Sequence, residues 1–548
     1  MPVPVVSRKV RFFKALRNII LWCGVVAAFH FLFAYVSEGE PFQHAFLALF
    51  TWRYLRLIGN IIGFYCYRPA VPLSNRPRYT PSKDVTVVIP TVDPNGKNFT
   101  ECVESVALNR PAKIVVVTVG QSLRTAAQAK VDALRHRFRD TQFVVDHSDI
   151  ANKRRQIAKG ISKATTLIIT FIDDTAVWGP NMLQSILYAF EEDPHVGLVG
   201  TNKWVRRVPG LSPWARIWNV LGATYLIRHN FEIRATNAID GGVFVVSGRT
   251  CAMRAELCKD PEFLAGYTNE MFFLGLLGPL NPDDDNYNTR FAVRRGWKIK
   301  IQYTPESEMI TTIGVTKGMS KFLGQCRRWA RTTWRSNVCS LITDRSIWAE
   351  QWWCIYAVYL TSLTNFALII DPLLIILAAL APALPNAITL PCLVGWILFT
   401  KMIKVFPYYR MHPQDLWTFP VYVGFAYFHS LIKFWALVTF WDCDWSGRKL
   451  EDVNKQAANP PPQSIELHNL SSPTGDAAAY CNGYANGHAN GHTNGYANGT
   501  VGTPSRARLS PRANSNSPGR LGRLSIDPIT VSHLLTAIVC RYLSRTMR

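Results

Sequence analysis

Residues 167–175 have the sequence LIITFIDDT, in which a strongly apolar run ends in two adjacent carboxylates. Short apolar runs rich in β-branched residues are typical of strands that are buried on both faces of a parallel sheet. Two carboxylates at the end of such a strand are costly unless a cation neutralises them. We therefore expect a strand over Leu167–Asp173 whose carboxyl end opens into a polar site.

Four more runs of this type occur nearby, and helical stretches separate them. The other expected strands are Val85–Thr91, Ile114–Val119, Phe143–Asp146 and Val196–Thr201. The expected helices include Asn98–Leu108, Arg124–Phe138 and Asn152–Ser162. This alternation, from about Asp84 to Glu306, predicts an α/β domain with a mostly parallel sheet and helices on both faces. Ligands of such sheets bind beyond the carboxyl ends of the strands.

Long apolar stretches flank this domain, and the composition, with 48% hydrophobic and 18% charged residues, suggests membrane segments. The stretches are Asn18–Tyr35, Phe42–Tyr67, Trp352–Leu384, which is broken only by Asp371-Pro372, and Ala387–Phe406. About 20 apolar residues span a bilayer, so these runs are long enough. The sequence predicts a multi-pass α-helical membrane protein with two spanning helices in residues 18–67 and two in residues 350–408.

The positions of the charges predict the topology. Five basic residues precede the first stretch, whereas the loop after it carries Glu38 and Glu40 and neither Lys nor Arg. The positive-inside rule then places a basic N-terminus, residues 1–17, and the α/β domain, residues 68–315, in the cytosol. The formal net charge of +23 thus fits membrane flanks and an Arg-rich tail. We expect no nucleic-acid partner, because the sequence lacks zinc-finger spacing and RNP-type motifs.

The C-terminal part divides into two segments. The aromatic-rich stretch Leu416–Trp441 either spans the membrane or lies in its interface. We favour the interfacial position, within residues 409–451, because a span would place the basic Arg448-Lys449 outside. Residues 452–548 are of low complexity, with Asn-Gly repeats, and we expect a disordered tail with a short helix near its end.

Polar residues that are suited to binding or catalysis follow the expected strands. Asp93, after the first strand, is suited to accept hydrogen bonds from a base or ribose, or simply begins a turn before Pro94. Lys153 opens a helix, where a diphosphate is favoured, although such a start is also often just solvated. Asp173 and Asp174 suit Mg²⁺ or Mn²⁺ that bridges phosphate oxygens.

Three consecutive carboxylates, Asp283-Asp284-Asp285, precede another helical stretch. Clustered carboxylates repel one another, so at least one is expected to have a raised pKa and to serve as a proton acceptor. The structural alternative is that they cap the helix.

The sequence QCRRW at residues 325–329 is the most specific motif. On a helix, Gln325, Arg328 and Trp329 share one face. That face joins an amide, a guanidinium suited to phosphate and an aromatic ring suited to stacking on a sugar. The alternative is an amphipathic helix at the membrane surface, within residues 316–349. The two interpretations are compatible, because a site at the membrane surface needs both.

This order of motifs resembles the processive family 2 glycosyltransferases, which include hyaluronan, chitin and cellulose synthases. The resemblance covers about residues 10 to 450 and is strongest to hyaluronan synthases and to fungal type 2 glycosyltransferases related to capsular polysaccharide synthase. It implies a cytosolic GT-A (Rossmann-like) domain, a UDP-sugar donor, inversion at the anomeric carbon and a growing polysaccharide as acceptor. It also implies membrane lipids as partners, a divalent metal and a multi-pass protein of the plasma membrane.

The resemblance also implies roles for individual residues. Asp93, Lys153 and Asp173 would contact the donor, and Asp174 would bind the metal. Asp285 would be the general base, because it keeps the family's spacing to Gly296-Trp297. The residues expected at the acceptor and diphosphate side are Gln325, Arg328, Trp329, Ser247 and Gly248, and those of a gating loop are Trp445 and Arg448.

One position departs from the family. Its metal motif is usually Asp-x-Asp, but alignment of Asp174 with the second Asp leaves Ile172 at the first position. Either Asp173 takes over part of that role or the nucleotide contacts differ. Two rival functions remain at this point, namely a non-processive transferase acting on a lipid carrier and a non-catalytic transporter or scaffold.

Overall fold

The computed structural model describes residues 7–74, 76–273, 275–315, 318–443 and 453–454 of the chain. The chain divides into two units, Met1–Glu466 and Leu467–Arg548, and the second lies outside the described residues. Trp445, Arg448 and nearly all of the expected tail also lie outside them. The expectations for the gating loop and the tail therefore stay predictions.

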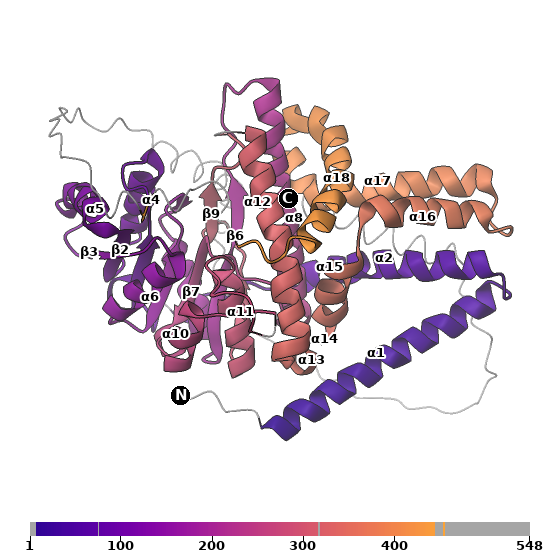
Figure 1. Cartoon of the computed structure of the whole chain (residues 1–548), viewed down its shortest axis with the longest axis horizontal. Coiled ribbons are helices and arrows are strands. Elements are labelled where there is room, and N and C mark those ends of the chain that lie inside the picture. The colour runs from indigo at the N-terminus through magenta and orange to yellow at the C-terminus, as the bar shows by residue number, and fades with distance from the viewer. Residues whose placement is uncertain (1–6, 75, 274, 316–317, 444–452, 455–548) are drawn as a thin grey trace, which may run out of the picture. The chain divides into compact units, whose positions relative to one another are not determined.

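A nine-stranded sheet forms the centre of the α/β domain (Figure 1). Its strands are β1 (Val85–Pro90), β2 (Lys113–Val119), β3 (Gln142–Ser148), β4 (Ile168–Ile172), β5 (Ala176–Trp178), β6 (Val196–Val205), β7 (Thr250–Arg254), β8 (Lys298–Gln302) and β9 (Glu308–Thr311). Their order is β3-β2-β1-β4-β7-β6-β9-β5, and β8 also pairs with β6. All five expected strands are present, with bounds shifted by a few residues.

The sheet is mixed. The pairs β1–β2, β1–β4, β2–β3, β6–β8 and β6–β9 are parallel, whereas β4–β7, β6–β7 and β5–β9 are antiparallel. The prediction of a mostly parallel sheet is confirmed for the half that holds β1 to β4. The other half differs because β7, which follows the 28-residue helix α8 (Pro213–Asp240), inserts between β4 and β6 in the opposite direction.

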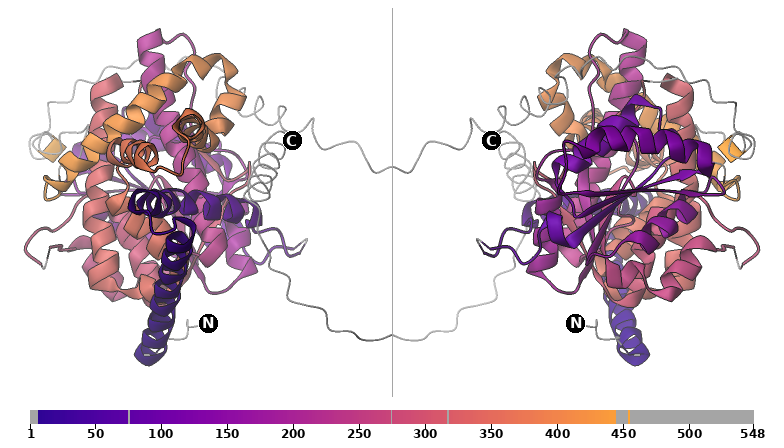
Figure 2. Two further views of the ribbon diagram at one scale, coloured as in Figure 1. Left: turned by 90° about the vertical axis from the view of Figure 1, so that its right-hand side faces the viewer. Right: turned by 90° about the vertical axis from the view of Figure 1, so that its left-hand side faces the viewer.

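Helices cover both faces of the sheet, as predicted (Figure 2). One hydrophobic core joins the sheet to α4 (Lys97–Leu108), α5 (Gly120–Arg135) and α7 (Met182–Glu192). The other joins it to α6 (Lys153–Lys163), α10 (Pro261–Thr268) and α11 (Asp284–Arg295). Val87 and Val88, neighbours on β1, belong to opposite cores, which explains why the strand is apolar throughout. Gly160 lets α6 approach Val88 so closely that a Cβ atom there would collide with it.

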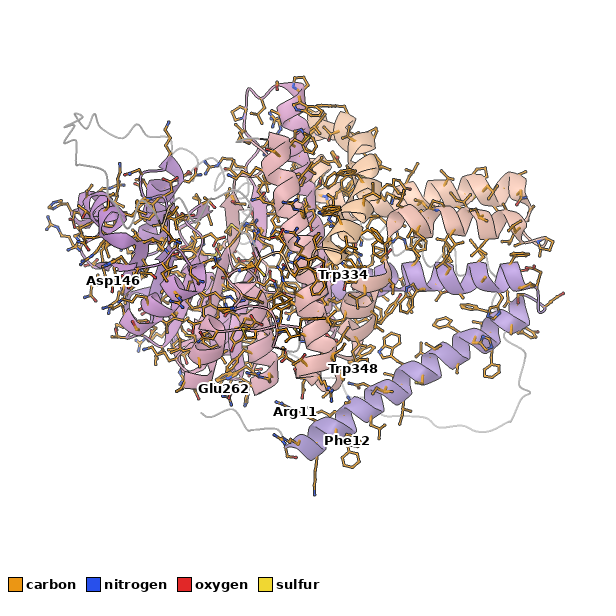
Figure 3. All side chains as sticks on the ribbon, viewed as in Figure 1. Arg11, Phe12, Asp146, Glu262, Trp334 and Trp348 are labelled. Atoms are coloured by element: carbon orange, nitrogen blue, oxygen red, sulfur yellow. The ribbon has the colours of Figure 1, made fainter. Side chains whose placement is uncertain are left out.

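Within the described part of the chain, three helices are long and apolar enough to cross a membrane, namely α1 (Arg8–Val36), α2 (Pro41–Cys66) and α17 (Asn386–Met411). A fourth candidate is the bent pair of 352–364 and α16 (Ala367–Leu380). α2, α16 and α17 lie side by side, and α1 exposes apolar side chains such as Phe12 (Figures 1 and 3). These helices are compatible with membrane association.

The third apolar stretch bends at a different place from the expected one. The two halves meet at an angle of 93° around Asn365-Phe366, whereas Pro372 lies inside α16. Lys433 stabilises the bend, since its ammonium donates to the carbonyl oxygens of Ser362 (2.7 Å) and Asn365 (3.1 Å). Carbonyls freed at a helix break need such partners. Asp371, the other residue expected to interrupt the stretch, forms ion pairs with Arg53 and Lys401.

Two further helices connect the domain to these apolar helices. α12 (Gly318–Thr332) carries the QCRRW motif and packs against α8 and α18 (Phe419–Leu437). α18 is not among the helices that qualify as spans by length and composition, and its interfacial position stays a prediction. The remaining short helical elements are α3 (Pro81–Asp84), α9 (Ala255–Cys258), α13 (Ser346–Glu350), α14 (Trp352–Cys354) and α15 (Thr361–Thr364). The segments Thr333–Asn337, Cys339–Asp344 and Ile355–Leu360 are π-helical, and Pro413–Thr418 is a 3-10 helix.

Candidate active site

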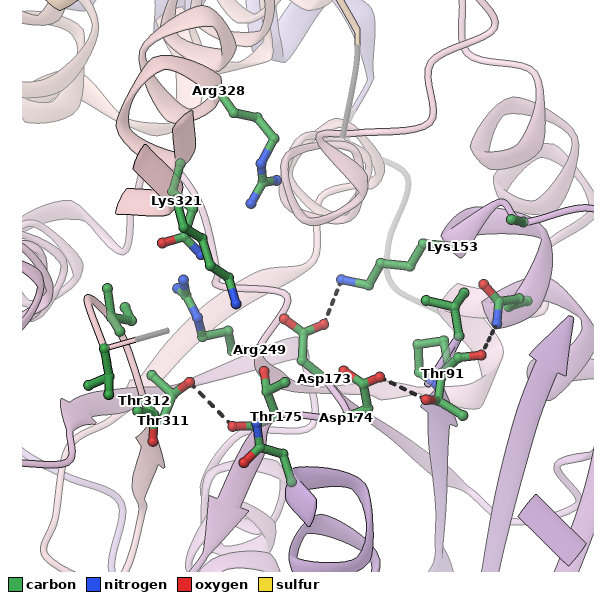
Figure 4. Close-up of a pocket in the computed structure, with 18 of the residues that line it drawn as sticks. Thr91, Lys153, Asp173, Asp174, Thr175, Arg249, Thr311, Thr312, Lys321 and Arg328 are labelled. Atoms are coloured by element: carbon green, nitrogen blue, oxygen red, sulfur yellow. Dashed lines mark hydrogen bonds and ion pairs between the residues drawn. The ribbon is translucent and has the colours of Figure 1, made fainter. Parts of the chain in front are cut away.

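A polar cavity of about 240 Å³ lies at the carboxyl ends of β1 and β4 (Figure 4). Residues from distant parts of the chain line it: Thr91, Lys153, Asp173, Asp174, Arg249, Lys321, Gln325 and Arg328. The location agrees with the rule that ligands of α/β sheets bind beyond the carboxyl strand ends. The cavity thus brings together the acidic pair that follows β4, the start of α6 and one face of α12.

Asp174 is held firmly at the floor of this cavity. Its side chain is buried, and the Thr91 hydroxyl donates to its Oδ2 at 2.7 Å. Thr91 is in turn fixed by Gln156, whose amide donates to the carbonyl oxygens of Thr91 (2.9 Å) and Val117 (2.8 Å). A carboxylate positioned in this way is suited to bind a hard cation together with phosphate oxygens.

Lys153 links two of the acidic motifs. Its Nζ lies 2.8 Å from Asp173 Oδ1 and 3.1 Å from Asp284 Oδ2. Burial alone would favour the neutral amine, but the two carboxylates raise the pKa of Lys153 above its ordinary value. Burial likewise opposes ionisation of Asp173, yet Lys153 keeps the pKa of that carboxyl below its usual range. Lys153 and Asp173 are therefore both charged at neutral pH.

Replacing Lys153 by methionine should destabilise the protein, because Asp173 and Asp284 would lose the ammonium that compensates them. Removing one partner of a buried ion pair costs about 3 kcal/mol. The check is the denaturant dependence of unfolding in detergent. Lys159→Met on the same helix is the matched control, because Lys159 is largely exposed and its replacement should change stability by less than about 0.5 kcal/mol. Equal effects of the two replacements would contradict this account.

The three carboxylates at 283–285 have three different surroundings. Asp283 is buried, but the Arg335 guanidinium 2.7 Å away keeps the pKa of that carboxyl below its usual range. Asp284 pairs with Lys153. Asp285 accepts a hydrogen bond from the Gly248 amide at 3.1 Å, while burial and the nearby Asp284 raise its pKa. Asp283 occupies the position before α11 but makes no side-chain capping bond there. Of the three, Asp285 is best suited to accept a proton.

A second cavity, of about 160 Å³, adjoins the first and contains Asp285. The two cavities share Lys153, Asp173, Arg249 and Arg328. Ser247, Gly248 and Trp329 line the second cavity. The Trp329 ring lies 4.9 Å from the ring of Tyr225, centroid to centroid, so the two form an aromatic wall. Such a wall offers a flat apolar surface to a sugar ring.

The five residues of the QCRRW motif do not all lie on the same face of α12. Gln325 and Arg328 line the first cavity, and Arg328 and Trp329 line the second. Cys326 is buried behind them, and Arg327 is exposed on the other side. The structure therefore places the three motif residues together, at the boundary between the two cavities.

Several residues of these cavities were not expected from the sequence, among them Arg249, Lys203 and His229. Arg249 lines both cavities, and its Cζ lies 5.3 Å from the centre of the Trp329 ring. Burial, and secondarily the nearby Arg328, lower the pKa of Arg249. Lys203 and His229 line the second cavity with the Lys203 Nζ 2.6 Å from His229 Nδ1, and burial lowers the pKa of both. The only indication of Arg249 in the sequence is its place next to Ser247-Gly248.

Asp93 is the expected site residue that the structure does not bring to the cavity wall. It is exposed beyond β1, and its amide donates to the Thr91 hydroxyl at 3.1 Å. Arg154, beside Lys153, has a structural part: its fully buried side chain pairs with Glu270 at 2.7 Å and donates to the carbonyls of Tyr267 and Pro282.

A mixed α/β sheet with carboxylates and cations at its strand ends, beside a cavity with an aromatic wall, defines a GT-A-like glycosyltransferase fold. Residues 81–332 match the family described as glycosyltransferase like family 2. A type 2 glycosyltransferase of Pyricularia oryzae is 37% identical over 449 residues, which cover 80% of this chain and 88% of the relative. A type 2 glycosyltransferase of Gibberella zeae is 39% identical over 441 residues, covering 79% and 80%. The chain belongs to the family 2 glycosyltransferases and is an enzyme that transfers a sugar.

Among solved structures, the chain is similar to a mannosyltransferase of Pyrobaculum calidifontis in complex with GDP-Man and Mn²⁺. The two are 16% identical, the alignment covers 65% of this chain and 97% of that one, and the TM-score is 0.38.

Proposed function

We propose that the protein is a processive, inverting glycosyltransferase that polymerises a UDP-sugar at the cytosolic face of the plasma membrane and exports the polysaccharide. The observation that carries this proposal is the meeting of two cavities at Arg249 and Arg328. One cavity has the cations and carboxylates suited to a nucleotide diphosphate, and the other has the proton acceptor Asp285 and the aromatic wall of Trp329. A donor sugar and an acceptor sugar would thus lie on opposite sides of the guanidinium groups of Arg249 and Arg328.

On the donor side, Lys153 and Asp173 would contact the nucleotide, while Arg249, Lys321 and Arg328 would face the diphosphate. Asp93 would contact the uridine only if the loop after β1 moved toward the cavity. No group of three or more His, Cys, Asp or Glu side chains able to hold a metal occurs among the described residues. A divalent ion such as Mg²⁺ or Mn²⁺ would therefore be held by Asp174 together with phosphate oxygens, the usual arrangement for Mg²⁺ at phosphates. The ion would neutralise charge on the diphosphate.

On the acceptor side, Asp285 would take the proton from the acceptor hydroxyl as its oxygen attacks the anomeric carbon. The bond from that carbon to the diphosphate breaks in the same displacement, so the configuration inverts and UDP leaves. Gly248, whose amide bonds to Asp285, would keep the carboxylate aimed at the acceptor, and Trp329 would hold the sugar ring. The cations Arg249 and Arg328 would stabilise the charge that develops on UDP.

Export is supported by a further cavity that continues from the acceptor side. It shares Tyr225, Phe244 and Thr333 with the cavity of Asp285 and lies against α2, α8 and α18. A growing chain that leaves the acceptor site in this direction would pass among the apolar helices. The gating role expected for Trp445 and Arg448 stays a proposal, because both residues lie outside the described part of the chain.

The experiment is a donor screen with the full chain in lipid nanodiscs. We expect UDP release from at least one UDP-sugar, with loss of the activity when EDTA removes divalent ions. Release from a GDP-sugar alone, or turnover that is unchanged by EDTA, would contradict the proposed donor and metal. A second candidate, non-processive transfer to a lipid carrier, is favoured by one specific observation, namely the cationic cavity described next.

A further inference from the structure

A cavity of about 230 Å³ lies among α2, α8, α17 and α18, beyond the sugar-transfer site. Its wall is unusually basic. Of the residues that the structure describes, one carboxylate, Glu232, and six cationic side chains line it: the cations are Arg53, Arg56, Arg228, Lys401, Lys404 and Lys433. α2 and α17 are candidate membrane spans, and four of these cations lie near the middle of those two helices. Charges in such a place are costly and indicate a function.

Carboxylates of the protein compensate four of the six cations. Glu232 pairs with Arg56 at 2.9 Å and with Lys404 at 3.1 Å. Asp371, just behind the wall, pairs with Arg53 at 2.8 Å and with Lys401 at 2.9 Å. Each of these carboxylates thus serves two cations, and an excess of positive charge remains.

Arg228 and Lys433 have no carboxylate partner within ion-pair distance in the described part of the chain. Arg228 makes no hydrogen bond there either, and its Cζ lies 4.9 Å from the centre of the Tyr225 ring. Lys433 donates to the two carbonyls at the helix bend, and its Nζ lies 4.4 Å from the centre of the Phe366 ring. His429, one turn before Lys433 on α18, has a buried Nε2 atom without a hydrogen-bond partner. All three residues line this cavity and the one that leads to the acceptor site.

We propose that this cavity binds the phosphate group of a membrane lipid, with Arg228 and Lys433 as its charge partners and His429 Nε2 as a hydrogen-bond partner. A phosphate concentrates its charge and acceptor oxygens on one centre, which suits a compact set of two cations and an imidazole. The carboxylates of an acidic polysaccharide would instead be spaced by sugar rings. The apolar lengths of α2 and α17 on either side suit the hydrocarbon part of a lipid.

The position of the cavity suggests what the lipid does. It connects with the acceptor site through the intermediate cavity, whose wall includes Tyr225, Phe244 and Thr333. A lipid phosphate held there would lie beside the path along which a growing chain leaves the acceptor site. Binding of the lipid rests on the membrane placement of α2 and α17, and its place beside the exit path rests on the proposed function.

The test measures lipid binding rather than turnover, so its failure is distinguishable from failure of the proposed function. The full chain in nanodiscs is titrated with a long-chain isoprenyl phosphate, and bound lipid is counted by native mass spectrometry. The matched arms are the same isoprenol without phosphate, inorganic phosphate and a uronic acid oligosaccharide. The double variant Arg228→Gln/Lys433→Gln is compared with Lys130→Gln/Arg139→Gln, which removes the same charges from exposed positions on and after α5.

We expect the isoprenyl phosphate to bind and the double variant to weaken its binding at least tenfold, while the control pair and the isoprenol show no comparable effect. Lys433→Gln alone should weaken binding in the same direction if the double variant does not fold. Equal binding of isoprenol and isoprenyl phosphate would overturn the proposal. Binding of inorganic phosphate as tight as that of the lipid would also overturn it. So would a double variant that loses binding of the oligosaccharide instead of binding of the lipid.

Discussion

Asp285→Asn should lower the rate of sugar transfer by about 10³-fold, the effect expected when a general base is removed. The amide keeps the shape of the side chain but takes no proton from the acceptor hydroxyl. Initial rates of UDP release in nanodiscs measure the effect. Asp149→Asn, on an exposed loop, is the matched control and should retain the wild-type rate. A rate for Asp285→Asn within tenfold of wild type would rule out Asp285 as the base.

The same variant should be at least as stable as the wild type. Because burial and Asp284 raise the pKa of Asp285, the folded protein holds this proton more tightly than the unfolded chain does. Its contribution to stability is therefore full below the unfolded pKa of about 3.9 and is lost as the pH rises through the raised folded pKa. At neutral pH the asparagine removes this cost, and thermal unfolding should show an equal or higher Tm. The wild-type rate should fall as the pH drops through the raised pKa.

Arg328→Ala should produce the second largest loss, about 10²–10³-fold in kcat, as expected for removal of one preorganised group that stabilises transition-state charge. Its guanidinium lies at the boundary of the donor and acceptor cavities, where negative charge develops as UDP leaves. The measurement is kcat with saturating donor.

Arg327→Ala provides a control on the same helix. Arg327 is exposed and lines neither cavity, so its replacement makes the same change in charge and helix propensity without touching the site. It should leave kcat within about twofold of the wild type. Similar losses for both variants would mean that Arg328 acts through the charge of α12 as a whole rather than at the reacting groups.

The sequence predicts the parallel half of the sheet well, because strands such as β1 and β4 are buried on both faces and therefore apolar throughout. It does not predict β5, β7, β8 or β9. Those strands have three to five residues and lack the long apolar run that indicates β4. The antiparallel pairing of β7 depends on the path of α8 across the domain, which no local pattern encodes.

In the site, too, residues that belong to a local pattern are predicted and residues that depend on the tertiary fold are not. Asp174, Asp285 and the QCRRW residues were expected because each belongs to a motif in which neighbouring residues give the chemical meaning. Arg249, Lys203 and His229 were missed because each is a single residue on a different element, and only folding brings them to one cavity. The position of Arg249 beside the Trp329 ring is a tertiary property, as is the exposure of Asp93 beyond the end of β1.

The length of the product tests the central claim most directly. Full-length protein in nanodiscs would be supplied with the UDP-sugar that it turns over, carrying a radioactive sugar, and the products would be separated by size with Asp285→Asn as the blank. We expect polymers of many sugars at early times, when most enzyme molecules have not yet finished a chain. A product of one sugar on a lipid, with no longer species at any time, would contradict processive synthesis.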